Sequence, residues 1–119
     1  MAQHLEVGKS GENLAAAWLQ KNGYLILERN WKLGHLEIDL IAAKGEWLHF
    51  IEVKTRSSRQ WGGPEDSVQV KKFNRWRNAA QGYLQHQRKY RWIQFDIIAV
   101  TLLDNNQFQL ELFEDVYLR

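Results

Sequence analysis

The sequence contains no cysteine, and this absence excludes a disulfide framework, a zinc finger and a thiol nucleophile. It also lacks an apolar run of about 18 residues that could span a membrane. Its first residues, "MAQHLEVGKSGENL", lack the apolar segment of a secretory signal. We therefore expect a cytoplasmic protein that does not enter the membrane. The 119 residues have an ordinary composition and predict one domain over residues 1–119.

Acidic residues are scarce between residues 54 and 91, where ten Lys and Arg residues accompany only two carboxylates. This segment carries a net charge of +8, whereas the rest of the chain carries −6. Such an asymmetry predicts a polyanionic partner. A solvated helix face without a partner is the alternative that charge alone leaves open.

Apolar periodicity predicts two helices. The first is expected over residues 8–23, with Ser10 as its N-cap and Gly23 as the residue that ends it. The second is expected over residues 64–89 or 67–89, after a loop that holds the only proline. The apolar side of this second helix is expected to consist of Phe73, Trp76, Ala80 and Tyr83.

Five apolar or alternating segments predict strands, at residues 24–31, 35–43, 46–56, 91–103 and 108–116. The first three strands are sequential and can form an antiparallel meander. The fourth follows a helical crossover and should pair parallel to one of them. The predicted fold is therefore α/β, with a mixed five-stranded sheet flanked by helices.

Three carboxylates interrupt the apolar strands around a predicted hairpin turn at Lys44-Gly45. Glu37 and Asp39 lie in "LEIDLIA", and Glu52 lies in "FIEVKT" with Lys54 two residues further on. Because side chains alternate along a strand, Glu37 and Asp39 share one face and Glu52 and Lys54 share one face. The predicted turn brings these two faces to the same side of the sheet, whereas a one-residue slip would put the acids of one strand on the apolar side.

In this register Asp39 lies opposite Phe50 and Glu37 opposite Glu52, so Asp39 and Glu52 are diagonal neighbours about 7–8 Å apart at Cα. Two carboxylates this close repel each other unless a cation neutralises them or one takes a proton. Oxygen ligands suit Mg²⁺ or Mn²⁺, which also make water a usable nucleophile. With the Lys54 ammonium, the acids form a sufficient set for phosphodiester hydrolysis. A surface ion pair and a charged sheet edge are the plainer alternatives.

Several short motifs occur in order along the chain: "GKSGENLAAAWLQKNGY", "RNW", "GHLEIDLIA" and "FIEVKTR". Their order and spacing resemble those of the YraN-like family of bacterial proteins, which is grouped by similarity with Holliday-junction-resolvase-like nucleases. Asp39 followed by Glu52-Val53-Lys54 also resembles the motif of the PD-(D/E)xK nuclease superfamily, with Ile38 in place of its proline. The resemblance implies a restriction-endonuclease-like core of order αβββαβ, which agrees with the elements predicted above.

The resemblance also implies a role for each matching residue. Asp39 and Glu52 would bind Mg²⁺ or Mn²⁺ together with the backbone carbonyl of Val53. Lys54 would contact the attacking water or the phosphate. Glu12 matches a first-helix acid that can join the metal site in resolvase-like relatives, and the alternative is an acid in the first turn that complements the helix dipole.

Five basic residues are expected to bind nucleic acid. Arg56 and Arg59 follow the third strand and are expected to clamp the phosphate backbone. Lys71 and Lys72 lie early in the second helix, where one of them is expected to contact a phosphate near the scissile bond. Arg75 belongs to the same group. Solvent exposure without a partner is the alternative for the helix residues.

Two further residues stand out from their surroundings. Trp61, in "RQWGGPE", either stacks on an exposed base or folds back onto the core. Asp96 lies in the apolar strand "FDIIAV" and is expected to be a buried, hydrogen-bonded acid without a catalytic role.

Together these features support the hypothesis of a Mg²⁺- or Mn²⁺-dependent endonuclease that acts on DNA, branched or otherwise structured. A homodimer would supply the two sites that cutting a junction requires. A non-catalytic nucleic-acid-binding module with the same fold and a protein-interaction adaptor are the alternative hypotheses.

Overall fold

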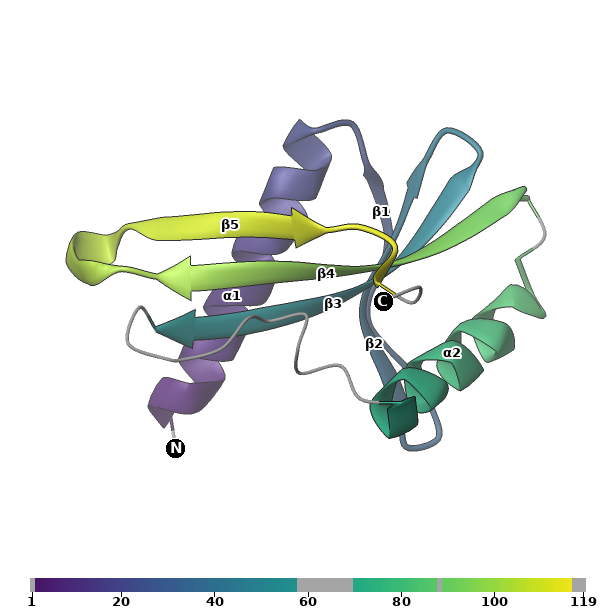
Figure 1. The fold of residues 1–119 in the computed structure, drawn as a ribbon, viewed down its shortest axis with the longest axis horizontal. Coiled ribbons are helices and arrows are strands. Elements are labelled where there is room, and N and C mark those ends of the chain that lie inside the picture. Colours follow the sequence, from purple (N-terminus) through teal and green to yellow (C-terminus); the bar gives the residue numbers. More distant parts are fainter. Residues whose placement is uncertain (1, 58–69, 88, 117–119) are drawn as a thin grey trace.

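The computed structural model describes residues 2–57, 70–87 and 89–116, with the backbone alone for residues 2–9 and 70–72. Its helices and strands follow one another as shown in Figure 1: α1 (Ala2–Lys21), β1 (Leu25–Leu33), β2 (Leu36–Lys44), β3 (Trp47–Ser57), α2 (Val70–Leu84), β4 (Trp92–Leu102), the 3₁₀ turn η2 (Asp104–Asn106) and β5 (Phe108–Phe113).

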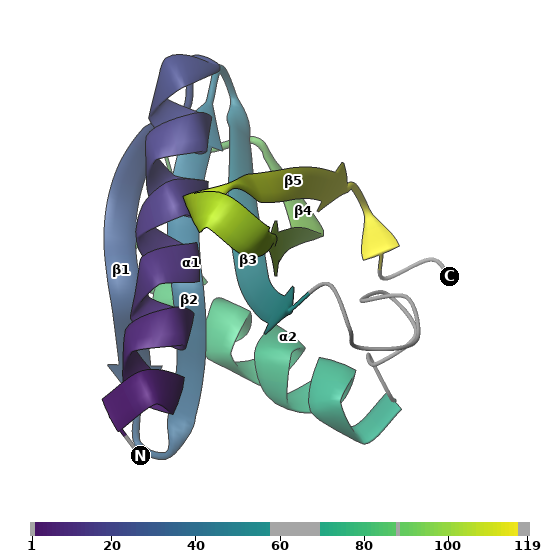
Figure 2. The same ribbon diagram turned by 90° about the vertical axis from the view of Figure 1, so that its left-hand side faces the viewer.

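The strands form one mixed sheet in the order β1-β2-β3-β4-β5. β3 and β4 run parallel, as their arrowheads show in Figure 1, and the other neighbouring pairs are antiparallel. This confirms the predicted α/β fold, including the order αβββαβ and the parallel strand after the second helix. The two helices lie on different sides of the sheet (Figure 2).

Each helix covers its own apolar core. Beneath α1, Leu19 packs against a layer that includes Ile51. Beneath α2, Trp76 and Tyr83 pack against a layer that includes Phe50, and the predicted apolar side of this helix is thereby confirmed. The sheet is therefore covered on both faces, and polar side chains within it need partners or solvent.

The first helix begins earlier than predicted. α1 begins at Ala2 rather than at residue 8, so Ser10 lies inside the helix and is not its N-cap. The preceding residues contain no proline and therefore do not stop the helix. Its end is as predicted, because Gly23 has a φ of 88° and the N–H of Tyr24 donates to the carbonyl of Leu19 at 2.9 Å, which is the Schellman arrangement.

The second helix ends earlier than predicted, at Leu84 rather than at residue 89. The N–H groups of His86 and Gln87 donate to carbonyls three residues back, which closes the last turn before the chain becomes extended in β4. Its predicted start and most of the preceding loop lie outside the described residues. Among the described elements, neither α1 nor α2 has the length and hydrophobicity of a membrane-spanning helix.

The β2–β3 turn is displaced by one residue from its predicted position. Lys44 pairs with Trp47, so the turn consists of Gly45 and Glu46. Gly45 has a φ of 62°, and its freedom to adopt a positive φ favours the first turn position. The register consequently differs from the prediction by two residues, and an even difference keeps paired side chains on their predicted face.

Asp96 is fully buried and hydrogen-bonded, as predicted. Its Oδ2 lies 2.7 Å from Nδ1 of His49, which is also buried. Its Oδ1 accepts hydrogen bonds from Nε2 of Gln94 at 2.9 Å and from the N–H of Asp115 at 3.0 Å. The carboxylate thereby links β3, β4 and the segment that follows β5.

Gly11 allows α1 to lie directly against β3. A Cβ at this position would lie 1.9 Å from Oγ1 of Thr55 and 2.9 Å from its Cβ. No side chain other than hydrogen fits this approach without movement of the helix or the strand. The contact sets the position of the following residue, Glu12, relative to the sheet.

We predict that Gly11→Ala lowers the free energy of unfolding by about 1–3 kcal/mol, because the added methyl group pushes α1 away from Thr55. Urea denaturation measures this change. Helix propensity alone predicts the opposite sign, a gain of about 1 kcal/mol. A second substitution, Thr55→Ala, should recover part of the loss. A Gly11→Ala variant as stable as the native protein would contradict the close contact.

Candidate functional site

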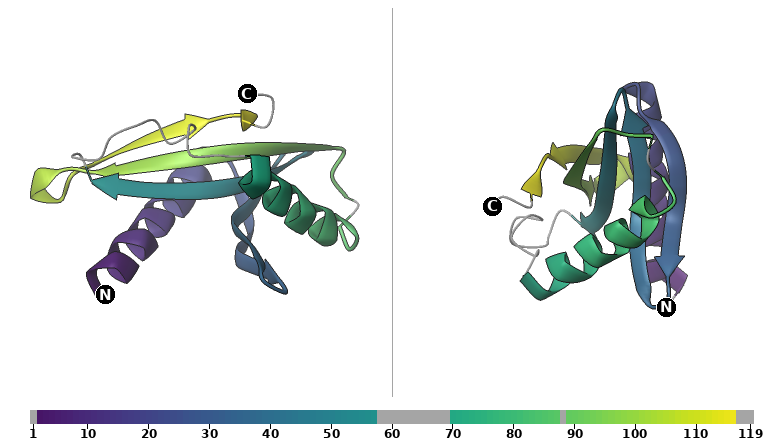
Figure 3. Two further views of the ribbon diagram at one scale, coloured as in Figure 1. Left: turned by 60° about the horizontal axis from the view of Figure 1, so that its bottom comes forward. Right: turned by 90° about the vertical axis from the view of Figure 1, so that its right-hand side faces the viewer.

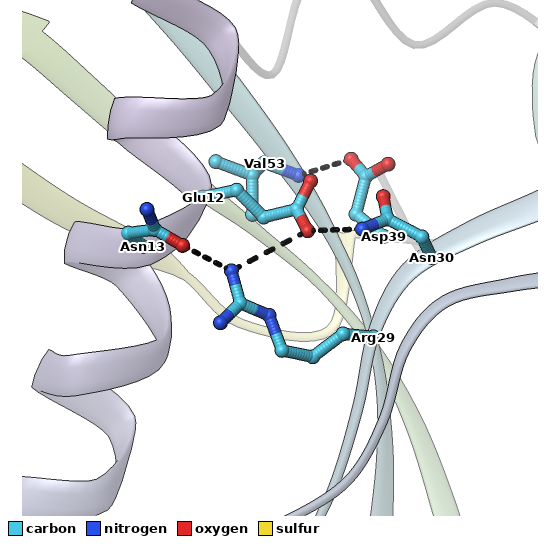
Figure 4. Close-up of polar contacts among 6 residues, drawn as sticks. All are labelled: Glu12, Asn13, Arg29, Asn30, Asp39 and Val53. Atoms are coloured by element: carbon cyan, nitrogen blue, oxygen red, sulfur yellow. Dashed lines mark hydrogen bonds and ion pairs between the residues drawn. The ribbon is translucent and has the colours of Figure 1, made fainter. Parts of the chain in front are cut away.

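The candidate site forms where β2 separates from β3. The two strands pair only as far as Leu40 and Ile51, and the next residue of β2 is Asp39. Oδ2 of Asp39 accepts a hydrogen bond from the backbone N–H of Val53 at 2.8 Å (Figure 4). A side-chain carboxylate therefore takes the place that a backbone carbonyl would occupy in a continuous ladder.

The predicted alternation of side chains along β2 holds only in part. Strict alternation would place Ile38 and Leu40 on one face and Ile41 on the other. Instead, Ile38 packs in the core beneath α2 together with Ile41, whereas Leu40 packs beneath α1. The alternation fails because β2 is no longer held by β3 before Leu40 and turns toward α2, as the lower end of the β1–β2 hairpin shows in Figure 3.

Glu52 and Lys54 belong to β3 and lie near Asp39 of β2. The side chain of Glu52 is 19% exposed, and its Oε2 is buried. Nζ of Lys54 lies 3.8 Å from Oε1 of Glu52, which makes the two an ion pair. The structure thus brings together the two acids and the lysine that the sequence singled out.

The pKa of the Asp39 carboxyl is raised from its ordinary value to about 6. Burial is the largest cause, and the neighbouring carboxylates of Glu52, Glu12 and Glu37 raise the pKa further, in that order. The hydrogen bond from Val53 acts in the opposite direction. At neutral pH the site therefore concentrates negative charge that a cation would stabilise.

Glu12 reaches toward this site from α1 and is held by residues of β1 (Figure 4). Its Oε1 accepts a hydrogen bond from Nδ2 of Asn30 at 2.7 Å and lies 3.7 Å from Nη2 of Arg29. The same guanidinium donates to Oδ1 of Asn13. Because α1 begins at Ala2, Glu12 is not in the first turn, and the helix-dipole interpretation loses its basis.

Arg29 and Asn30 are site residues that the sequence analysis did not assign. Asn30 has a φ of 53°, a conformation that asparagine tolerates better than most residues. This backbone conformation helps direct its amide toward Glu12. The signal in the sequence was the "RNW" motif, in which two polar residues interrupt an expected strand.

A pocket of about 160 Å³ adjoins the carboxylates. Glu37, Asp39 and Glu52 line it from the two strands, His35 from the β1–β2 turn and Arg75 from α2. Arg75 lines the pocket and is also exposed to solvent. Three carboxylates and one guanidinium therefore line the same pocket.

The other predicted nucleic-acid contacts are placed only in part. Arg56 lies two residues beyond Lys54 on β3, and its Nε donates to Oγ1 of Thr101 on β4 at 3.3 Å. Lys71 and Lys72 lie in the first turn of α2, where the backbone alone is described. Arg59 lies outside the described residues.

The donor set of the site matches the preferences of Mg²⁺ and Mn²⁺, because its side-chain donors are carboxylate oxygens. In the described part of the chain, no group of three or more His, Asp or Glu residues is arranged to hold a metal ion. The expected ligands are only two carboxylates, Asp39 and Glu52, with the Val53 carbonyl. Mg²⁺ sites commonly use one or two carboxylates together with water and substrate phosphates, so these residues fit such an ion.

The raised pKa of Asp39 predicts that Asp39→Asn stabilises the protein at pH 7 by about 1–3 kcal/mol. The folded carboxyl holds its proton more tightly than the unfolded one. The stability that this bound proton contributes is therefore fully present below about pH 4 and is lost as the pH rises through about 6. Asn keeps the acceptor for Val53 and carries no charge.

Urea denaturation between pH 4 and pH 8, with EDTA present, measures this difference. The native protein and Asp39→Asn should have equal stability near pH 4 and diverge as the pH rises. Asp104→Asn, at an exposed carboxyl, is the matched control and should follow the native profile. If Asp39→Asn were less stable than the native protein at pH 7, burial and repulsion would not be what sets the pKa of this carboxyl.

Comparison with known proteins identifies the family of this chain. Residues 11–100, which include every residue of the site described above, match the Uncharacterised protein family UPF0102. The chain is 41% identical to a UPF0102 protein of Bacteroides thetaiotaomicron and 44% identical to one of Flavobacterium psychrophilum. These matches cover 98% of this chain and 96% and 98% of the relatives. A UPF0102 protein of Rhodococcus opacus is 39% identical over 98% of this chain and 100% of its own length. The chain therefore belongs to the UPF0102 family.

Proposed function

We propose that this protein is a Mg²⁺- or Mn²⁺-dependent endonuclease that hydrolyses phosphodiester bonds in DNA, with branched or otherwise structured DNA as its substrate. The observation that carries the proposal is the crowding of carboxylates around Asp39, where Glu52, Glu12 and Glu37 all raise its pKa. Such crowding is unfavourable without a counter-ion, and a divalent cation is a counter-ion that can also catalyse phosphodiester hydrolysis.

Asp39 and Glu52, with the backbone carbonyl of Val53, are the residues that would hold the ion. When bound, the ion would supply positive charge against these acids and Lewis acidity toward the substrate phosphate. The Val53 N–H fixes the orientation of the Asp39 carboxylate before substrate arrives. Lys54, 3.8 Å from Glu52, would direct the attacking water or offset negative charge on the phosphate.

Basic residues near the pocket support DNA as the substrate. Arg75 lines the pocket, and a guanidinium is well suited to a phosphate. Arg56 follows Lys54 on the same strand. Both belong to the segment 54–91, whose net charge is +8. Contacts of this kind give affinity for the DNA backbone without sequence specificity.

The topology supports a nuclease of the PD-(D/E)xK type. The elements have the order αβββαβ, with Asp39 on the second strand and Glu52 and Lys54 on the third. This is the arrangement that the resemblance to that superfamily implies. Cleavage of two strands at a branch would require two such sites, so the proposal includes a homodimer.

A non-catalytic nucleic-acid-binding module is the second candidate, and specific contacts favour it. Glu12 already contacts Asn30 and Arg29, and Glu52 already pairs with Lys54. Part of the acidic charge is thus offset by the chain's own residues. In this case the basic residues would bind DNA, and no strand would be cut.

Cleavage of a panel of labelled DNA structures in the presence of Mn²⁺ tests the proposal. The panel contains duplex, single strand, flap and four-way junction. We predict that Lys54→Ala lowers the cleavage rate by about 10²-fold or more, because it removes a positive charge from the reacting phosphate. Calorimetric titration should show that Asp39→Ala loses Mn²⁺ binding. Lys21→Ala, at the exposed end of α1, is the matched control and should retain both properties.

Each other outcome leads to a different conclusion. Equal Mn²⁺ affinity in the native protein and in Asp39→Ala would refute the metal site. Salt-sensitive DNA binding without cleavage of any structure in the panel would support the second candidate. No DNA binding at all would leave a protein-interaction adaptor.

A further inference from the structure

Two tryptophans form an exposed stack at the end of the sheet where β3 and β4 begin (upper right in Figure 1). Trp47 and Trp92 are directly paired across the parallel strands, and their rings lie 5.9 Å apart with an interplanar angle of 29°. They are 42% and 48% exposed. We call this pair the Trp47–Trp92 platform. Large aromatic rings usually bury most of their surface, so exposing two of them together indicates a binding surface.

The backbone holds the platform in place. The N–H groups of Arg91 and Trp92 both donate to the carbonyl of Glu46, at 3.0 and 3.2 Å. These bonds join the beginning of β4 to the turn before β3. The backbone that carries the rings is therefore fixed, so a ligand that stacks on them need not order it.

Two cations, Arg91 and Lys44, lie near the platform. The guanidinium of Arg91 lies 5.4 Å from the ring of Trp92. On the side of β2, Lys44 pairs with Trp47, and its Nζ lies 4.8 Å from the ring of Tyr24. Aromatic rings and positive charges thus lie near one another at the end of the sheet where β2 ends and β3 and β4 begin.

We propose that the Trp47–Trp92 platform binds the unpaired bases of a single-stranded segment of nucleic acid. Every base presents a flat π-face that can stack on tryptophan, and stacking does not depend on sequence. The phosphates that join the bases match the flanking cations, Lys44 and Arg91. An apolar protein patch would cover the rings but would gain nothing from these charges, so charge complementarity favours nucleic acid.

The inference rests on the proposed function for its class of ligand, and it adds that the substrate carries unpaired bases. Trp47 precedes Glu52 by five positions on β3, a separation of about 16 Å along the strand. The platform is therefore distinct from the carboxylate site and needs no divalent cation. Trp61, the residue that the sequence suggested for base stacking, lies outside the described residues.

Fluorescence anisotropy with a labelled oligodeoxythymidine, in EDTA, tests the platform. Trp92→Ala and Trp47→Ala should each weaken binding by about tenfold or more, and Trp92→Phe should retain most of it. Phe108→Ala, which removes a 46% exposed ring from β5, is the matched control and should bind like the native protein. An abasic oligomer of the same length should bind the native protein weakly, and Trp92→Ala should weaken it no further.

Unchanged affinity of a folded Trp92→Ala protein, or equal affinity for the oligodeoxythymidine and its abasic counterpart, would overturn the inference. Far-UV circular dichroism establishes that each variant is folded, and Trp92→Phe provides a second test if Trp92→Ala is not. Binding in EDTA does not require a metal ion at the carboxylate site. A failure of cleavage with intact, platform-dependent binding would therefore count against the proposed hydrolysis and not against this site.

Discussion

The hydrogen bond from the Val53 N–H to the Asp39 carboxylate is the interaction on which the candidate site depends. It lies where β2 stops pairing with β3, so the N–H would otherwise lose its acceptor. Leaving a buried N–H unpaired costs about 1–3 kcal/mol. An amide oxygen would satisfy the same donor without adding charge. A carboxylate is present instead, and its pKa is raised to about 6, mainly by burial. Its presence indicates a position where charge serves a purpose other than stability.

The separation of β2 from β3 also explains how distant segments reach one place. As β2 turns toward α2, the pocket between the strands becomes accessible to Arg75. From the other side, Gly11 lets α1 approach β3 closely, and Asn30 and Arg29 hold Glu12 near Asp39. Residues from both helices and three strands therefore meet at one site.

The order of the elements along the chain and the convergence of acids were predictable because both follow from local periodicity. The convergence survived an error in the turn, since moving it to Gly45-Glu46 changed the register by two residues and kept each side chain on its face. The missed features depend on geometry that periodicity does not encode. Ile38 does not lie on the face that alternation predicts, because β2 no longer pairs with β3 at that position. Asn30 reached Glu12 through a positive φ that the sequence only hints at.

The tryptophans show the same difference between what local sequence predicts and what tertiary contacts decide. The strand pattern accounts for Trp47 and Trp92 as ordinary strand residues, and only the pairing of β3 with β4 makes them adjacent at an exposed end of the sheet. By itself, the sequence determined the order of the elements, the apolar faces and which acids share a side, because these depend on residues within a few positions of one another. Tertiary structure alone decided where β2 leaves β3, which groups surround Asp39 and which rings stay exposed, because these depend on contacts between segments far apart in the chain.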